Sequence, residues 1–423
     1  MKVAVIGGGV TGMAVVSGLQ STMDVTLYES QARLGGHTDT HNLFVDGRAY
    51  AIDSGFMAFN ADHFPSFSNW LDQLGVATQA TNMSFGVSIN SESSVDLVYG
   101  TGDLGALFSN RGNLLNQRFL RMLWDILRFY KEARKLNVVL GNTSAPRTSI
   151  TLGDYLDSAR FSAGFVEDHL LPLCMALWSI TLDQARELPL GYVLEFMGRH
   201  KLLQLEGRPA WRVVKGGSNR YVSAFLKAYR GKTLLSSPVT RIERNPGFVR
   251  VFTASGERRF DRVVFACHAD QALDLIEPSR AEREILSAFR YQSQNAVVHS
   301  DPSFMPIRSS AWSSWNVVGD DRIGLSITYW LNRLQSIENA PNLFVTLNPT
   351  RRPKSVWLDR VYKSPMFSLA TQAAQQRREE ISGHNRTYYA GAYWGFSTHE
   401  DGFVSGEQVA KAMMDLPRVA ESA

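Results

Sequence analysis

The chain of 423 residues is longer than one hydrophobic core usually serves, so two domains are expected. Hydrophobic residues make up 44% and charged residues 20%, values that are typical of a soluble globular protein. The net charge of +4 is mild and no long basic run occurs, so we expect no nucleic-acid partner.

Cysteines and histidines form no metal or disulfide pattern. No CxxC pairs Cys174 with Cys267, and the nine histidines include no HExxH, so no metal is expected. Three glycines interrupt the apolar N-terminal run, and no apolar stretch is long enough to span a bilayer. The sequence predicts a cytoplasmic protein, and its pI near 9.0 permits peripheral contact with the anionic inner membrane.

The first thirty residues carry a dinucleotide-binding pattern. Residues 3–6 form an apolar run suited to a buried parallel strand, and a helical stretch follows the glycines. Gly7, Gly9 and Gly12 match G-x-G-x-x-G: the first makes a tight turn, the second admits a pyrophosphate, and the third allows close helix packing. Glu29 ends the next strand, where an acid binds the ribose hydroxyls and disfavours a 2′-phosphate. Dinucleotide binding is therefore predicted, with NADP disfavoured.

The residues after Glu29 decide between FAD and NAD. The stretch "ESQARLGGHTDT" places Arg33, Gly35 and Gly36 directly after the ribose acid. It resembles the E-x-x-x-R-x-G-G-R/H motif of the flavin amine oxidase and phytoene desaturase superfamily, in which the arginine and glycines follow the pyrophosphate towards the flavin. The resemblance implies FAD as the cofactor. His37 follows the double glycine and is a further candidate for flavin contact, with a noncovalent site expected.

The same resemblance implies an α/β fold with a Rossmann-like FAD-binding domain, a parallel sheet with a β-meander, built from discontinuous segments. These segments are residues 1–60, 208–275 and 375–418. Ser54 and Gly55 in "DSGFMAFN" resemble a segment that passes near the flavin in relatives, although the same residues suit an ordinary strand-ending turn. Val239 in "SPVTRIE" matches a valine that holds the adenine through backbone groups in relatives.

Two insertions, residues 61–207 and 276–374, would build a mixed α+β substrate domain. The stretch 115–136 predicts a helix with four large side chains recurring on one face. They are Phe119, Leu123, Leu127 and Tyr130. Aromatic-rich strands occur in the second insertion, and their side chains either line an apolar tunnel or pack the sheet against helices. They are Trp312, Trp315, Tyr329 and Trp330.

The C-terminal stretch resembles the last part of the FAD domain in the same superfamily. A strand ending at Gly391 leads to the pair Asp401-Gly402, which opens the last helix. The resemblance implies that this helix N-terminus points at the pyrimidine edge of the flavin, where it stabilises negative charge by about 0.3–2 kcal/mol. Many relatives carry an acid directly after the Ala-Gly pair, but Ala392 stands here. FAD binding is therefore expected to rely more on Arg33 and backbone amides.

His399 and Glu400 are the candidate catalytic residues. His399 falls where amine oxidases place an aromatic residue over the flavin, and an ordinary histidine pKa suits proton transfer near neutral pH. A helix-capping or supporting role suits the same position equally well. Glu400 is the second candidate for the base that removal of two hydrogens from an unactivated chain requires.

More closely, the sequence resembles bacterial NAD/FAD-binding flavoproteins that are encoded beside cyclopropane-fatty-acid synthases. The resemblance rests on "RLGGH", "DSGFMAFN", "MSFGVS", "WSITLDQA" and the "GAYWGF…HEDGFVSG" ending. It implies an FAD-dependent oxidoreductase that removes hydride from a small apolar or lipid substrate. The implied substrate is a methylated or cyclopropane fatty acyl chain, and the implied product is desaturated.

Two alternatives stay open at this point. An amine oxidase acting on a hydrophobic amine would use Tyr393 or Trp394 in an aromatic pair, but the sequence assigns no lysine beside the flavin. A flavin-binding protein without turnover is the other alternative. No pattern in the sequence fixes an oligomeric state.

Overall fold

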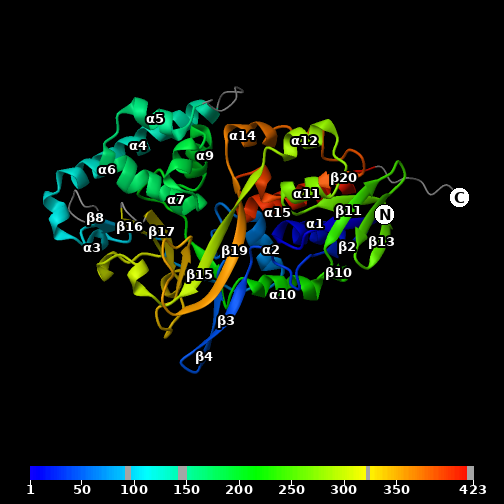
Figure 1. The fold of residues 1–423 in the computed structure, drawn as a ribbon, viewed down its shortest axis with the longest axis horizontal. Helices are drawn as coiled ribbons and strands as arrows, with labels where there is room; N and C mark the ends of the chain where they lie inside the picture. The colour runs from blue at the N-terminus through cyan, green and yellow to red at the C-terminus, as the bar shows by residue number, and fades with distance from the viewer. Residues whose placement is uncertain (91–96, 142–149, 321–323, 417–423) are drawn as a thin grey trace.

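A five-stranded parallel sheet lies at the end of the molecule that carries both termini (Figure 1). The computed structural model describes residues 1–90, 97–141, 150–320 and 324–416. The strands lie in the order β10–β2–β1–β14–β20, and every pair is parallel. Their bounds are β1 (Lys2–Ile6), β2 (Asp24–Tyr28), β10 (Lys232–Leu234), β14 (Arg262–Phe265) and β20 (Thr387–Tyr389). This sheet confirms the predicted α/β class.

Helices cover this sheet, which is why β1 reads as a continuous apolar run. Helix α1 (Val10–Leu19) follows β1 and packs against the last helix, α15 (His399–Met414). Two glycines of α15 make that approach possible. A Cβ at Gly402 would lie 2.8 Å from Thr11 Oγ1, and one at Gly406 would lie 2.6 Å from the Thr11 carbonyl oxygen. The N-terminal and C-terminal segments therefore share one apolar core.

A three-stranded antiparallel meander follows β10 along the chain. It consists of β11 (Val239–Arg244), β12 (Val249–Thr253) and β13 (Gly256–Phe260). The short helices α11 (Ala269–Asp274) and α12 (Arg280–Leu286) pack with it in a second apolar cluster. The meander confirms the β-meander predicted for the FAD-binding fold.

A seven-stranded sheet forms the other lobe, in the order β19–β15–β18–β17–β16–β7–β8. Its strands are β7 (Phe85–Asn90), β8 (Leu97–Gly100), β15 (Arg290–His299), β16 (Trp315–Asp320), β17 (Gly324–Trp330), β18 (Phe344–Leu347) and β19 (Val356–Met366). The β16–β7 pair is parallel and the other pairs are antiparallel. The long strands β15 and β19 run side by side between the two lobes (Figure 1).

Helices pack on one side of this sheet around the largest apolar cluster. They are α3 (Leu104–Leu107), α4 (Gln117–Gly141), α5 (Leu152–Ala159), α6 (Ala163–Phe165), α7 (Leu171–Trp178), α8 (Leu182–Glu187) and α9 (Leu190–Arg199). A short π-helix, η2 (Val166–Leu170), leads into α7. In the described part of the chain, no helix has the length and apolar character needed to cross a membrane.

Helix α4 forms where the sequence predicts a helix, but its buried face differs from the expected one. Phe119 and Tyr130 are buried as expected, whereas Leu127 is 54% exposed. Eight residues make about 2.2 turns, so Leu127 points about 80° away from Phe119. The buried stripe instead includes Met122 and Phe129.

The fold also contains shorter helices and strands. They are β3 (Thr40–Val45), β4 (Arg48–Asp53), β5 (Ala58–Phe59), α2 (Pro65–Gln73), β6 (Thr78–Ala80), β9 (Arg212–Val214), α10 (Asn219–Ala228), α13 (Leu331–Leu334) and α14 (Leu369–Gln375). Helix α2 lies just after the segment 1–60, yet its Phe67 and Trp70 pack in the core beneath the parallel sheet. Residues 417 and 418 of the third expected segment lie outside the described residues.

Candidate active site

A cavity of about 1220 Å³ runs from the parallel sheet into the other lobe. We call its first part the glycine-loop end, lined by residues 6–11, 28–31 and 35–37 among others. We call its other part the aromatic end, lined by Leu173, Trp178, Phe196, Trp315 and Tyr329 among others. Ligand sites for one small molecule usually measure roughly 300–1,000 Å³, so this cavity is large enough for a cofactor and a substrate together.

The three predicted glycines have different surroundings. A Cβ at Gly12 would clash with the carbonyl oxygen of Gly7, and one at Gly7 would lie 2.5 Å from the carbonyl oxygen of Ala266. Gly12 is buried and does not line the cavity. By contrast, a Cβ at Gly9 would meet no protein atom within 4 Å, and Gly9 lines the cavity. Packing within the protein thus explains Gly7 and Gly12 but does not explain Gly9.

Gly9 also begins α1, and no side chain caps this helix N-terminus. The first turn of a helix presents backbone N–H groups without intrahelical partners, together with the positive end of the helix dipole. Because this turn lines the cavity and carries no acidic side chain, it fits a bound anion.

Glu29 lies beside this turn at the end of β2. One carboxylate oxygen accepts a hydrogen bond from the Gly8 N–H at 2.8 Å, and the other accepts one from the Gln31 N–H at 2.8 Å. The oxygen that accepts from Gln31 also accepts from the Ser30 hydroxyl at 3.1 Å, whereas the oxygen beside Gly8 can accept a further bond, and Glu29 lines the cavity. The carboxylate is therefore fixed in position, and it can accept from a ribose hydroxyl beside Gly8 and from a second one if the Ser30 hydroxyl turns away.

Arg33 shapes the loop that follows. Its guanidinium donates to the carbonyl oxygens of Thr38 at 2.9 Å and Gly36 at 3.1 Å, and it pairs with Asp39 at 3.0 Å. Gly35 and Gly36 have φ angles of 121° and 58°, which glycine adopts at low cost. These contacts hold the loop against the glycine turn, since Gly35 forms an isolated bridge with Gly9.

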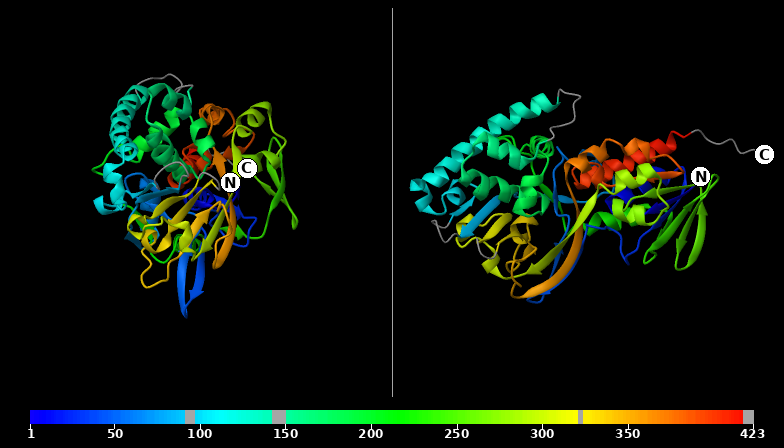
Figure 2. Two further views of the ribbon diagram at one scale, coloured as in Figure 1. Left: turned by 60° about the vertical axis from the view of Figure 1, so that its left-hand side comes forward. Right: turned by 45° about the horizontal axis from the view of Figure 1, so that its top comes forward.

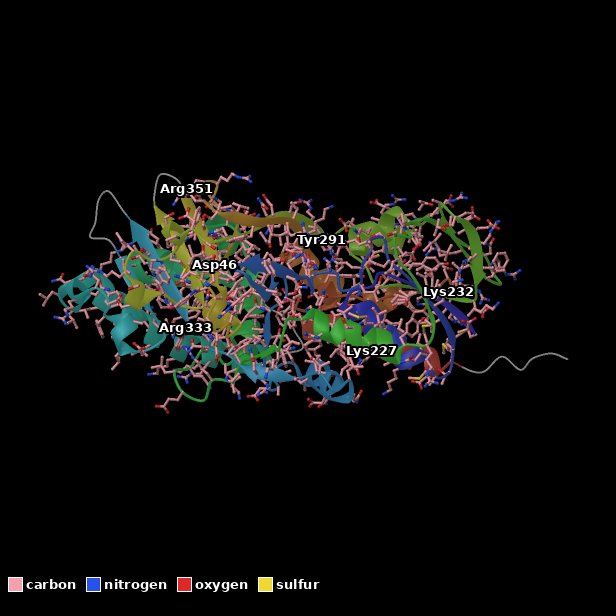
Figure 3. The ribbon with its side chains drawn as sticks, turned by 90° about the horizontal axis from the view of Figure 1, so that it is seen from below. Asp46, Lys227, Lys232, Tyr291, Arg333 and Arg351 are labelled. Carbon is pink, nitrogen blue, oxygen red and sulfur yellow. The ribbon has the colours of Figure 1, made fainter. Side chains whose placement is uncertain are left out.

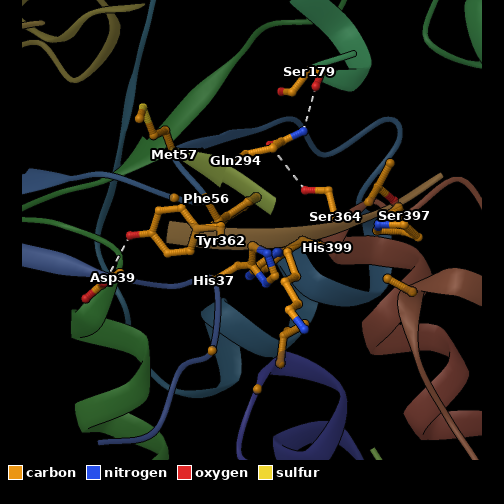
Figure 4. Close-up of a pocket in the computed structure, with 18 of the residues that line it drawn as sticks. His37, Asp39, Phe56, Met57, Ser179, Gln294, Tyr362, Ser364, Ser397 and His399 are labelled. Atoms are coloured by element: carbon orange, nitrogen blue, oxygen red, sulfur yellow. Dashed lines mark hydrogen bonds between the residues drawn. The ribbon is translucent and has the colours of Figure 1, made fainter. Parts of the chain in front are cut away.

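A polar cluster lies where the loop meets β19. Burial opposes the ionisation of Asp39, but the hydrogen bond with His41 and the charge of Arg33 hold its pKa below the usual value. The Tyr362 hydroxyl lies 2.9 Å from Asp39 and 2.5 Å from the hydroxyl of Ser54 (Figure 4). Asp39 and Tyr362 were not predicted, because they are 323 positions apart and neither belongs to a motif.

His37 and Gly55 lie in the same region. His37 lines the cavity, with its ring centroid 5.5 Å from that of Tyr362, and burial lowers its pKa. A Cβ at Gly55 would clash with the carbonyl oxygen of His37, so the two chain segments touch through backbone. Gln294 lies nearby and bridges two elements. It donates to the carbonyl oxygen of Ser179 at 2.6 Å and accepts from the Ser364 hydroxyl (Figure 4).

Val239 and Gly391 complete the glycine-loop end. Val239 begins β11 at a shift in strand register, and it lines the cavity together with Ser237. Gly391 follows β20 and donates its N–H to the hydroxyl of Ser405 on α15 at 3.1 Å. Both residues therefore lie at the same end of the cavity as Gly9.

His399 lines the cavity but is held by close neighbours. Its ring stacks on Phe56 with centroids 3.5 Å apart, and its Nε2 lies 2.9 Å from the Tyr221 hydroxyl and 3.2 Å from Thr38 Oγ1. Burial lowers the pKa of His399 to about 3. An imidazole with this pKa accepts a proton poorly at pH 7, so His399 is a weaker base than the sequence indicates.

Glu400, Asp401 and Gly402 do not line the cavity. The Glu400 carboxylate accepts the backbone N–H groups of Ser66 and Phe67, both at 2.9 Å, and so caps α2. Asp401 accepts from the N–H of Thr398 in a capping box at the start of α15. The structure therefore does not bring Glu400, the second candidate base, next to a substrate, because its carboxylate is bound to a helix N-terminus.

At the aromatic end, the four candidate aromatic residues divide into two pairs. Trp315 and Tyr329 are directly paired between β16 and β17 and line the cavity. Trp330 follows Tyr329 along the strand, so its side chain points to the opposite face, where it packs against Trp312 at 5.3 Å. The tunnel interpretation therefore holds for the first pair, and the packing interpretation holds for the second.

The aromatic end has neutral histidines and, among its described lining residues, no carboxylate. Burial, and then the charge of Arg208, lower the pKa of His169 to about 4, and burial lowers the pKa of His200 to about 4. Among the described residues that line the cavity, the acids are Glu29, Asp39 and Asp274. All three belong to segments around the parallel sheet, so the aromatic end is an apolar space that carries one positive charge, that of Arg208.

The glycine-loop end fits the ADP half of FAD. The uncapped start of α1 would hold the pyrophosphate, and Glu29 would hold the ribose hydroxyls. No protein atom explains why a glycine stands at position 9, but a pyrophosphate in the open space in front of it would. When bound, FAD supplies a hydride acceptor, and the protein supplies position and a dry environment.

Solved structures with the same fold include two amine oxidases and a fatty acid isomerase. Cyclohexylamine oxidase from Brevibacterium oxydans IH-35A is 18% identical, with a TM-score of 0.70 over 97% of this chain and 98% of its own. Putrescine oxidase bound to putrescine is 14% identical, with a TM-score of 0.69 over 98% of this chain and 99% of its own. The CLA-producing fatty acid isomerase from P. acnes is 15% identical, with a TM-score of 0.68 over 97% of this chain and 98% of its own.

At these identities the likeness establishes the fold alone. No curated protein matches the sequence. The sequence pattern of the family described as flavin containing amine oxidoreductase matches residues 10–302, which is more than half of the chain. The chain therefore belongs to the flavin containing amine oxidoreductase family and is an FAD-dependent oxidoreductase, as its motifs predict.

Proposed function

We propose that the protein oxidises an apolar acyl chain, a methylated or cyclopropane fatty acyl group, to a desaturated product. The observation that carries this proposal is the lining of the aromatic end. Trp178, Phe196, Trp315 and Tyr329 surround the space, and no carboxylate lies there among the described lining residues. An ammonium group would find no counter-charge at this end, whereas an acyl chain finds an apolar wall.

The chain's own residues have defined parts in this reaction. The apolar walls exclude water and hold the acyl chain, and Gln294 fixes the place where the two lobes meet, through its bonds to Ser179 and Ser364. His399 positions the cavity wall through its stack on Phe56. Desaturation removes a hydride and a proton from neighbouring carbons; bound FAD would supply the hydride acceptor and be reoxidised by O₂ or another acceptor, and the proton would be released to solvent.

Amine oxidation is the second candidate, and one observation favours it. Lys363 on β19 is the one lysine among the described residues that line the cavity. In the class of amine oxidases that the sequence resembles, a lysine is linked to the flavin through water. A hydrophobic amine that binds as the neutral base would need no carboxylate.

An anaerobic absorbance titration of the FAD-loaded protein tests the proposal. Lipids with methylated or cyclopropane acyl chains form one arm, and cyclohexylamine and putrescine form the other. We expect the lipids to bleach the flavin band and the amines to leave it unchanged. Bleaching by amines alone would replace the proposal with amine oxidation, and Lys363→Met would then be expected to slow it.

Bleaching by neither class would favour a flavin-binding protein without turnover and would overturn the proposal. Trp315→Ala and Trp330→Ala form a matched pair for the lipid arm. Both remove an indole from the same sheet, but only Trp315 lines the cavity. A lipid that reduces both variants as readily as the wild type does not react at the aromatic end.

A further inference from the structure

One surface of the helical lobe exposes apolar side chains in a continuous stripe. The 3₁₀-helix η1 (Arg111–Leu115) leads into α4, and Leu115 is 89% exposed. Leu120, Trp124 and Leu127 follow at helical spacing on α4, and Trp124 is 53% exposed. Single exposed apolar residues are ordinary, but a stripe of this kind marks an interaction surface. We call it the α4 face.

Basic side chains border this stripe, mainly on one side, because at 100° per residue Arg121, Arg128 and Lys135 lie on one side of it and Arg134 on the other. Those on α4 are Arg118, Arg121, Arg128, Lys131, Arg134 and Lys135. The acids of the described helix are Asp125, which is buried, and Glu132. Arg121 and Arg128 pair with these acids and Arg118 pairs with Glu167 and Asp168, so Lys131, Arg134 and Lys135 supply most of the net positive charge. The guanidinium groups of Arg121 and Arg128 lie 4.6 Å and 5.9 Å from the ring of Trp124. The α4 face therefore combines an exposed aromatic centre with a positive rim.

A second cavity, of about 1300 Å³, begins beside the α4 face. Leu115 and Arg118 line it at the surface, and Met175 of α7 lines it further inside. Ser179 and Leu347 line both this cavity and the cavity of the active site. The two cavities are therefore neighbours, and the second cavity lies between the α4 face and the aromatic end.

The two cavities also share a floor. Along β17, alternate residues point to the same side of the sheet. Tyr329 lines the active-site cavity, while Ile327 and Leu325 on the same side line the second cavity. Helix α7 lies above both, because Leu173 lines the first and Met175 lines the second.

We propose that the α4 face docks on a membrane of anionic phospholipid, and that the second cavity admits an acyl chain from that membrane. An apolar stripe bordered by Lys and Arg is the pattern of a helix that lies in the interface plane of a bilayer. The positive rim matches the negative charge of such a lipid surface. Admission of the acyl chain rests on the proposed function, whereas docking requires no turnover.

Figures 1 and 2 show why this surface is accessible. Helix α4 lies on the outer edge of the helical lobe, at the end of the molecule away from both termini. Lys227 and Lys232 lie near the opposite end, beside the parallel sheet (Figure 3). The molecule therefore offers a matched pair of exposed lysines at a distance from the proposed docking surface.

Vesicle sedimentation of the FAD-loaded protein tests docking. Vesicles of phosphatidylcholine alone are compared with vesicles that contain equal amounts of phosphatidylcholine and phosphatidylglycerol. We expect binding to the anionic vesicles only, with loss of binding as salt is raised. Each Lys or Arg near an anionic surface strengthens binding about fivefold, so Lys131→Glu with Lys135→Glu should weaken it at least about 25-fold.

The double variant Lys227→Glu with Lys232→Glu has the same change in net charge and should retain binding within about twofold. Trp124→Ala should weaken binding about fivefold, whereas Phe44→Ala, which removes a 72% exposed ring on the β3–β4 hairpin, should not. The flavin spectrum and the melting temperature of each variant check that it is folded and loaded.

Three results would overturn docking: no binding of the wild type to anionic vesicles, equal losses in the two lysine variants, or a dimer that Trp124→Ala dissociates. The last result would identify a second copy of this chain as the occupant of the α4 face. Flavin reduction by vesicle lipids is then measured separately. Docking without reduction would reject the proposed function, and reduction without docking would reject the α4 face.

Discussion

The two ends of the active-site cavity are built in different ways. At the glycine-loop end, Gly9 and Glu29 are 20 positions apart and belong to a single strand–helix–strand unit. At the aromatic end, Trp178 and Phe196 come from one insertion, and Trp315 and Tyr329 come from the other, more than 100 positions later. The comparison teaches that cofactor binding here depends on local backbone geometry, while the substrate wall depends on how separate elements pack.

The first prediction tests the glycine-loop end with two substitutions, one that clashes with the protein itself and one that projects into the cavity. Gly12→Val forces side-chain atoms into the Gly7 carbonyl, so we expect it to destabilise the protein by about 3 kcal/mol or more. Gly9→Ala meets no protein atom, so the melting temperature of the apoprotein should stay unchanged while FAD affinity falls at least about tenfold. Thermal unfolding and FAD titration measure both. Normal FAD affinity in Gly9→Ala would show that no ligand approaches this turn.

Removing the ribose acid should affect one end alone. Glu29→Ala deletes two charged hydrogen-bond acceptors, each worth about 1.5–3 kcal/mol, so FAD affinity should fall about 100-fold. The flavin that remains bound should be reduced with the same half-saturating concentration of donor as in the wild type. Fluorescence titration of the apoprotein with FAD gives the affinity, and an unchanged value would exclude ribose contact.

At the aromatic end, Trp315→Ala should raise the half-saturating concentration of an apolar donor about 30-fold, because it deletes buried contact area from the wall. FAD affinity should stay within about twofold. Stopped-flow flavin reduction measures the first quantity and FAD titration the second. Equal effects on both would mean that the two ends are not independent.

Acid should destabilise the aromatic end through His169. Its pKa is lowered to about 4 in the folded protein, against about 6.5 when unfolded, so the unfolded state binds the extra proton as pH falls. Stability that is present at pH 7 should decrease by about 2 kcal/mol at pH 5 from this residue. Denaturant unfolding at both pH values should show a loss that is smaller by that amount in His169→Gln.

Asp53 acts in the opposite direction within the same range. Burial raises its pKa to about 6, so the folded state binds the proton first and stability rises as pH falls from about 6 to 4. Asp53→Asn should therefore steepen the acid loss, and His169→Gln should flatten it. If the free energy of unfolding falls equally steeply with decreasing pH in both variants, neither group is linked to unfolding.

The smallest effect is expected at Glu400. Glu400→Gln weakens the cap of α2, so stability should fall by about 1 kcal/mol. Because this carboxylate does not line the cavity, flavin reduction should change less than about twofold. A large loss of reduction rate at unchanged melting temperature would restore Glu400 as a base.

The sequence predicts best those site residues that lie close together along the chain. Gly7, Gly9 and Glu29 lie together as the motif indicates, since a strand, a turn and a helix place them without help from the rest of the chain. The parallel sheet and the meander were predicted from the family resemblance. Strand runs and turn residues indicate the single strands, but not the pairing of β1 with β14 across 259 positions.

Contacts between distant segments were not predictable. Tyr362 meets Asp39 only because β15 and β19 bring the second insertion back to the first loop. The low pKa of His399 comes from burial beside Phe56, which the sequence around His399 does not indicate. The α4 helix was predictable, but its exposed stripe depends on which side meets the rest of the lobe.

The paired strands β15 and β19 have a mechanical consequence. Eleven residues of β19 at about 3.3 Å each span about 35 Å, and ladder hydrogen bonds join the two strands over most of that length. We expect a ladder of this kind to resist hinging of the two lobes, so that the distance between the glycine-loop end and the aromatic end stays the same when a substrate enters. Substitutions in the aromatic wall would then change the fit of a substrate without changing that distance.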